Sequence, residues 1–131
     1  MKYLIVFALL ISFSSCSSKK LTTKGLKSNM EEKTGVIFKD GKKSDTTESF
    51  YYVLNEKDLA KGLGRFDSAK AGCISYFNQP GTCRMIMDKA YFQWNKEGFS
   101  AVLVSALDKD SNVVFNIVTS VKPILLNEEH P

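Results

Sequence analysis

The clearest pattern of hydrophobic and polar positions lies in the C-terminal half of the chain. Three segments rich in β-branched and aromatic residues follow one another there: Arg84–Trp94, Phe99–Leu107 and Val113–Val121. Polar connections of hairpin length, 95–98 and 108–112, separate them, and apolar residues alternate along the second and third segments. The pattern therefore predicts a three-stranded antiparallel meander.

Weaker signals precede this meander. Two short runs, Thr34–Lys39 and Ser49–Leu54, have the composition of strands. A helix is expected after Asn55, whose side chain can cap its first turn, and a second short helix is expected over Ser68–Phe77. The turn-forming residues at 78–81 must end that second helix.

Three apolar residues after Asn55 recur at helical spacing. Leu59, Leu63 and Phe66 are expected to form the buried face of the first helix, which Gly62 and Gly64 keep short. Together these elements predict a single α+β domain over residues 34–131. It consists of an antiparallel sheet of about five strands with one or two short helices on one face.

The start of the chain has the three parts of an export signal. Lys2 supplies a positive charge, Tyr3–Ile11 is an unbroken apolar run, and small residues lead up to Cys16. The apolar run is shorter than the roughly 20 residues that a membrane-spanning helix needs. Residues 1–15 are therefore predicted to be a signal peptide that is removed.

Ser14-Ser15-Cys16 resembles the lipobox of bacterial lipoproteins, although Phe13 stands where that family prefers leucine. The resemblance implies that the thiol of Cys16 receives a diacylglycerol and that the new amino terminus is acylated with a fatty acid such as palmitate. Ser17 stands where an aspartate often retains such proteins at the inner membrane. The resemblance therefore implies a lipid-anchored protein of the cell envelope, exported through the periplasm to the outer membrane.

The segment that follows Cys16 carries the positive charge of the chain. Between Ser17 and Met30 there are four lysines and no acidic residue, while the mature sequence beyond Met30 has slightly more acidic than basic groups. The net charge of +4 thus does not describe a basic domain surface, and nucleic-acid binding is not expected. Residues 16–33 have few apolar positions and no period, so they are predicted to form a flexible tether.

Two cysteines remain in the predicted domain, Cys73 and Cys83. A pair of cysteines in an exported protein suggests a disulfide, and the turn-forming residues between them allow the chain to fold back. Closing such a loop stabilises a fold by about 2.5–3 kcal/mol in the chain-entropy description. The alternative is two separate buried thiols.

The histidine content limits the chemistry that is available. His130 is the only histidine, so neither a histidine-dependent triad nor a typical catalytic zinc site can be built, and no metal or other cofactor is expected. Asp108, Asp110 and Asn112 imitate the opening of a calcium loop. However, Val113 and residue 119 replace the glycine and the acid that the loop requires, so a hairpin turn is favoured.

Aromatic residues concentrate on the predicted strands. Because neighbours on a strand face opposite ways, one set can fill the core while the other forms a recognition surface. Tyr51, Tyr91 and Trp94 are the candidates for that surface. The alternative is a core on one face with scattered aromatic residues elsewhere.

The predicted leader and the missing catalytic residues favour a non-enzymatic binding module in the cell envelope. Its partners are the membrane, contacted through lipid, and another envelope protein. One alternative is an inhibitor or immunity-type lipoprotein that protects against a toxin, phage or hydrolase, with a rigid protruding loop near Asn78–Cys83. The other is a hydrolase or sugar-binding protein that uses carboxylates and a concave aromatic pocket.

Overall fold

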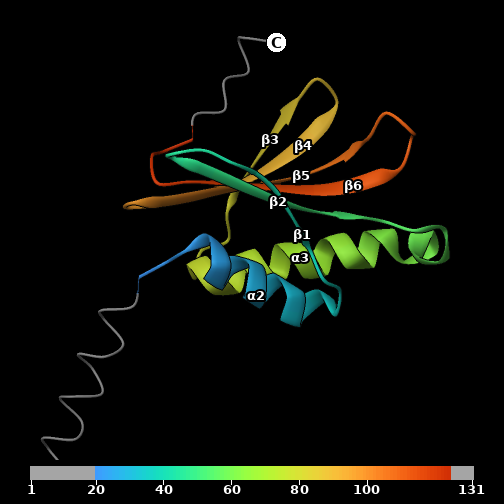
Figure 1. Cartoon of the computed structure of the whole chain (residues 1–131), viewed down its shortest axis with the longest axis horizontal. Helices are drawn as coiled ribbons and strands as arrows, with labels where there is room; N and C mark the ends of the chain where they lie inside the picture. The colour runs from blue at the N-terminus through green and yellow to red at the C-terminus, as the bar shows by residue number, and fades with distance from the viewer. Residues whose placement is uncertain (1–19, 125–131) are drawn as a thin grey trace, which may run out of the picture.

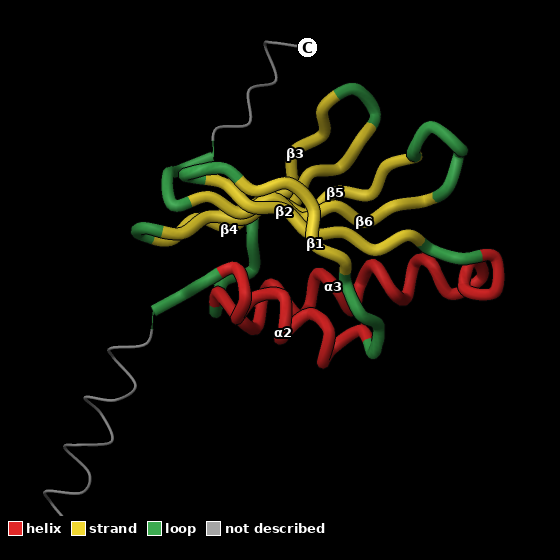
Figure 2. Tube along the Cα trace, viewed as in Figure 1, coloured by secondary structure: helices red, strands yellow, loops and turns green. Residues whose placement is uncertain are grey.

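The computed structural model describes residues 20–124 and shows an α+β fold in two layers (Figures 1 and 2). Its elements in chain order are α2 (Thr23–Thr34), β1 (Lys39–Lys43), β2 (Thr47–Val53), the 3-10 helix η1 (Glu56–Lys61), α3 (Gly62–Phe77), β3 (Thr82–Ile86), β4 (Lys89–Lys96), β5 (Phe99–Leu107) and β6 (Val113–Ser120). One layer is an antiparallel sheet with the order β1-β2-β6-β5-β4-β3, and the helices cover one face of it. The expected class is confirmed, with six strands in the sheet instead of about five.

The predicted signal peptide, Cys16 and His130 lie outside the described residues. Among the helices formed between residues 20 and 124, none is long and apolar enough to cross a membrane.

Helix α2 corrects the prediction of a flexible tether over residues 16–33, which is wrong from residue 23 onward. The Thr22 side chain accepts a hydrogen bond from a first-turn amide, and Gly35, with φ of 75°, ends the helix in the left-handed conformation. Leu26 and Met30, one turn apart, are fully buried. So few apolar residues give no clear period in the sequence, and the helix depends on packing against α3.

The helical segment after β2 is continuous. As predicted, Asn55 caps it, because its side-chain oxygen accepts a hydrogen bond from the Asp58 amide at 3.0 Å. The 3-10 helix η1 leads directly into α3, so the two expected short helices form one continuous helical segment. Asn78 ends α3 in the left-handed conformation with φ of 55°.

The buried face of this segment differs from the prediction. Leu59 and Leu63 are 53% and 78% exposed, and only Phe66 packs against the core. The buried stripe runs in steps of about one turn from Phe66 through three further positions of α3: Ala69, Cys73 and Phe77. At its start the stripe continues to Gly62, which lies against the Leu54 side chain, so Leu63 is rotated towards solvent.

The predicted strand over residues 84–94 is in fact the β3–β4 hairpin. Met87 and Asp88 form its tight turn, with φ values of 49° and 68°. Two consecutive positive φ values are typical of a type I′ turn, which asparagine and glycine usually signal. Because neither residue is present here, the sequence pattern hid the turn, and the meander has four strands.

Strand β1 begins later than the predicted run over Thr34–Lys39. It extends beyond that run to include Asp40 and Gly41, and its pairing with β2 is irregular there. A Cβ on Gly41 would collide with the Ser49 hydroxyl of β2, so glycine permits this close approach.

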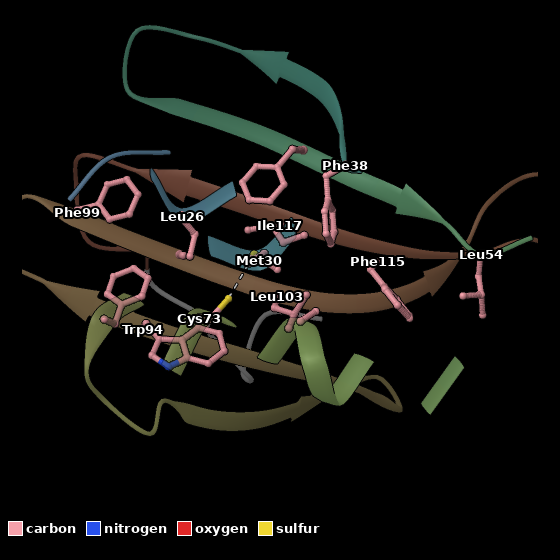
Figure 3. Packing of buried hydrophobic residues seen from close by; sticks show 14 residues of the cluster. Leu26, Met30, Phe38, Leu54, Cys73, Trp94, Phe99, Leu103, Phe115 and Ile117 are labelled. Carbon is pink, nitrogen blue, oxygen red and sulfur yellow. Dashed lines mark hydrogen bonds between the residues drawn. The ribbon is translucent and has the colours of Figure 1, made fainter. Parts of the chain in front are cut away.

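The core lies between the sheet and the two helices (Figure 3). Phe77 of α3 stacks on two aromatic residues of the sheet, Trp94 and Phe99, with ring centroids 6.2 and 5.6 Å away. Leu103 and Ile117, from the two central strands, are fully buried. These contacts fix which face of each strand is buried, so the alternating residues must lie on the opposite face.

Candidate functional site

The face of the sheet opposite the helices, called the outer face here, carries two of the three predicted surface aromatics. Tyr51 on β2 pairs with Asn116 on β6, which pairs with Val104 on β5, which pairs with Tyr91 on β4. Residues directly opposite on antiparallel strands share a face, so the four side chains form one row. The two tyrosines stand three strand spacings apart, roughly 14 Å.

Apolar side chains surround this row. Valines occupy neighbouring outer-face positions on the three adjoining strands: Val53, Val102, Val114 and Val118. A shallow cavity of about 290 Å³ lies beside Tyr51, and its lining includes Val53, Val114 and Asn116. The outer face thus combines a valine-rich floor with half-exposed tyrosines and one amide, the composition of a surface that can bind a protein.

The chain after β6 covers part of the outer face. Val121 donates its amide hydrogen to the Thr46 carbonyl at 3.0 Å, and the Gln93 side chain donates a hydrogen bond to the Ile124 carbonyl. Gln93 is directly opposite Val102, and both are buried. Residues 121–124 therefore lie against the part of the face around Gln93, while the row from Tyr51 to Tyr91 remains accessible.

Trp94 does not belong to this surface, and its prediction as a surface residue is wrong. It is fully buried on the face towards the helices, where its indole N–H donates a hydrogen bond to the Gln79 carbonyl at 3.1 Å. A separation of three residues along β4 places Tyr91 and Trp94 on opposite faces. Gly81 also packs against the Trp94 ring, so loop 78–81, part of the segment that the inhibitor hypothesis invoked, is held against the core at this residue.

The predicted disulfide is absent from the described structure, in which Cys73 and Cys83 are both free. The Cys73 thiol is buried between the helices and donates a hydrogen bond to the Met30 sulfur at 3.6 Å, whereas Cys83 is exposed on the edge strand β3. Burial raises the pKa of the Cys73 thiol to about 12, which keeps it protonated and unreactive near neutral pH. The structure therefore supports separate thiols, of which only Cys73 is buried.

A polar cluster that sequence reasoning missed joins β2, η1, α3 and the end of α2. The Tyr52 hydroxyl donates a hydrogen bond to Asp58 Oδ2 at 3.0 Å, and Arg65 Nη2 lies 3.6 Å from Asp58 Oδ1. Arg65 Nη1 also donates a hydrogen bond to the Thr34 carbonyl at 2.6 Å. The separation of seven residues between Asp58 and Arg65, two helical turns, was the only signal for this cluster in the sequence.

The electrostatics of this cluster favour a structural role. Burial, together with the hydrogen bond to the Asp58 carboxylate, raises the pKa of Tyr52, so its phenol stays protonated and acts as a donor. The Arg65 side chain caps the carbonyl end of α2 and is half-buried. Each of these contacts links two elements of the fold, so the cluster holds the helices to the sheet.

The loop that imitates a calcium site forms the β5–β6 hairpin turn, as favoured from the sequence. Asp108 Oδ1 accepts hydrogen bonds from the amides of Asp110 and Asn112, both at 2.9 Å. These bonds lower the pKa of the Asp108 carboxyl. In the part of the chain that the structure describes, no group of three or more His, Cys, Asp or Glu residues is arranged to hold a metal ion.

No family model, curated protein or solved structure matches the chain.

Proposed function

We propose that the chain is a bacterial lipoprotein whose domain is a non-enzymatic binding module, held at the outer membrane by lipid on Cys16. Its outer face contacts another protein of the cell envelope. The leader sequence supports the location of the protein, and the outer face of the sheet supports its binding role.

The leader and the fold together support the anchored state. The lipobox-like Cys16 lies only four residues before Lys20, where the described domain begins. One acyl chain binds a membrane reversibly, whereas two or more anchor a protein stably. Lipidation of Cys16 would therefore convert this small domain into a membrane-bound one.

The observation that carries the binding role is the alignment of Tyr51 and Tyr91 in one accessible row of the outer face. Tyrosine is enriched at protein interfaces because it buries a large apolar ring and keeps a hydroxyl for hydrogen bonding. The matching partner surface would be apolar at its centre, to cover the valines, with polar groups placed for Asn116 and the two hydroxyls.

The polar groups near the core support binding over catalysis. The Tyr52, Asp58 and Arg65 side chains are engaged in contacts that hold the helices to the sheet. An activated nucleophile would need an adjacent general base, and the buried Cys73 thiol faces a methionine sulfur instead.

Photo-crosslinking in the producing cell tests this role. A photoreactive amino acid is placed at Tyr51 or Tyr91 in the acylated full chain, and at Lys109 on the β5–β6 turn as the control. We expect one envelope protein to crosslink from positions 51 and 91 but not from 109. The crosslink should disappear when Val104→Lys adds a charge between the two tyrosines.

Two results would contradict the proposed contact. One is a set of crosslinks that is the same at all three positions. The other is a crosslink at position 51 that persists in the Val104→Lys variant while that variant remains folded.

A further inference from the structure

Residue 20, the first described residue, lies at the same end of the domain as two turns of the sheet. We call this end the proximal end, formed by residues 20–23, the β1–β2 turn at 44–46 and the β4–β5 turn at 97–98. These segments lie together at the left of Figure 1, opposite η1 at the right. Two cavities confirm their proximity: Phe99 lines one with Lys20 and Lys96, and another with Thr23 and the β1–β2 turn.

From this arrangement we propose that the proximal end is the membrane-facing surface of the domain and contacts anionic phospholipid headgroups through its lysines. The inference rests on the proposed function, because it needs lipid on Cys16. It adds an orientation that lipidation alone does not give.

The reach of the chain is the first argument. Lys20 is only four positions after Cys16, and a fully extended chain spans at most roughly 14 Å over four positions. A domain that measures several tens of ångströms cannot turn freely on such a short connection. The end that holds Lys20 must therefore stay near the bilayer surface, and η1 must point away from it.

Charge is the second argument. The three segments of the proximal end hold Lys20, Asp45 and Glu97. When the adjoining residues of α2, β1, β2, β4 and the segment after β6 are included, exposed lysines outnumber acidic residues: Lys20, Lys24, Lys43, Lys96 and Lys122 against Asp45, Glu48 and Glu97. Lys43 has Glu48 within 3.6 Å, but no acidic group in the described residues forms an ion pair with Lys20 or Lys96. Those two line a common cavity of about 400 Å³ together with Glu97, so that two lysines and one carboxylate lie around it. The net positive charge there would attract an anionic headgroup.

The orientation also fits the proposed partner surface. The strands run from the proximal end towards the opposite end, so a bilayer at the proximal end lies across the strand ends (Figure 1). The outer face, with the row from Tyr51 to Tyr91, then stands upright on the membrane. A neighbouring envelope protein can reach it from the side.

Lysine footprinting on vesicles tests the orientation. The mature acylated protein is inserted into phosphatidylcholine vesicles with or without phosphatidylglycerol and treated with a membrane-impermeant acetylating ester. Mass spectrometry then gives the reactivity of each lysine. On anionic vesicles we expect Lys20, Lys43 and Lys96 to react about fivefold more slowly than on neutral ones, the factor that corresponds to roughly 1 kcal/mol of attraction per lysine. Lys89 and Lys109, at the opposite end, should be unchanged.

A pair of charge-reversal variants provides the control. Lys20→Glu combined with Lys96→Glu should abolish the protection of Lys43, whereas Lys89→Glu combined with Lys109→Glu should preserve it. All four positions are exposed, so both proteins should fold. Equal reactivity of all lysines, protection of Lys89 and Lys109, or protection that does not depend on phosphatidylglycerol would overturn the inference.

The outcomes separate this inference from the proposed function. Protein without fatty acid on Cys16 would contradict the proposed function. Acylated protein with unprotected proximal lysines would contradict only the orientation.

Discussion

Gly72 of α3 lies directly against Met30 of α2. A Cβ at position 72 would stand 3.0 Å from the Met30 Cα and 3.2 Å from its Cγ. The adjacent Asn29 side chain donates a hydrogen bond to the Gly72 carbonyl at 2.7 Å. The two helices therefore meet backbone to backbone, and this contact determines how α2 covers the sheet.

Replacing Gly72 with alanine should separate the helices. Alanine improves helix propensity by up to about 1 kcal/mol, but the collision with the Met30 backbone should outweigh that gain. We expect the free energy of unfolding to fall by about 1–3 kcal/mol, the usual cost of overpacking, as measured by urea denaturation.

Gly64 offers a matched control in the same helix, because nothing lies within 4 Å of a Cβ placed there. Gly64→Ala should stabilise the protein by a few tenths of a kcal/mol up to about 1 kcal/mol. Equal effects of the two substitutions would contradict the close helix contact.

Leu26→Ala tests whether α2 belongs to the folded domain. Leu26 is fully buried, so its truncation should cost about 2–5 kcal/mol. Ile37→Ala, at a side chain that is 80% exposed, should change stability by less than about 0.5 kcal/mol. If Leu26→Ala had as little effect as Ile37→Ala, this segment would be a tether after all.

The neighbouring tyrosines of β2 should respond differently to loss of the hydroxyl. Tyr52→Phe removes the hydrogen bond to the Asp58 carboxylate and should lower the free energy of unfolding by about 1–2 kcal/mol. Tyr51→Phe, on the outer face, should have almost no effect on stability. Comparable losses in the two variants would show that the Tyr52–Asp58 bond does not contribute as described.

The two thiols should differ in reactivity. In the native protein at pH 8, iodoacetamide should modify the exposed Cys83 and leave the buried Cys73 intact, and both should react in denaturant. Mass spectrometry of the modified peptides measures this. If neither cysteine reacted until the protein had been reduced, a disulfide between Cys73 and Cys83 would be present after all.

The buried thiol also predicts a pH dependence. The pKa of Cys73 is about 12 in the folded state, above the ordinary value of 9.0, so the unfolded chain loses its proton first as the pH rises. Stability should therefore be fully present below pH 9 and fall above it, by about 1.4 kcal/mol per pH unit from this group. The Cys73→Ala variant, although less stable, should lack this component of the slope. If the free energy of unfolding of the two proteins fell in parallel above pH 9, Cys73 would not be the cause of the pH dependence.

Local patterns predicted those parts of the fold in which each segment carries its own signal. The alternation from Phe99 to Leu107 identified a strand, and Asn55 identified a helix start, because both signals depend on residues near in sequence. Helix α2 gave no such signal, since Leu26 and Met30 become a buried face only when α3 packs on them.

The candidate surface also depends partly on tertiary packing that local sequence patterns do not reveal. Strand alternation alone separates Tyr91 from Trp94, so that error was avoidable from the sequence. The alignment of Tyr51 with Tyr91 was not predictable, because it depends on β6 and β5 lying between β2 and β4 with one particular register. Register across four strands is set by tertiary packing, which no short segment encodes.

Mass spectrometry of the amino-terminal peptide of the mature protein, purified from bacterial membranes, tests the lipid anchor directly. We expect a peptide that begins at Cys16 and carries a diacylglycerol on its sulfur, with a further fatty acid on its amino group. A mature protein that begins at another residue, or whose Cys16 carries no lipid, would contradict the proposed anchor.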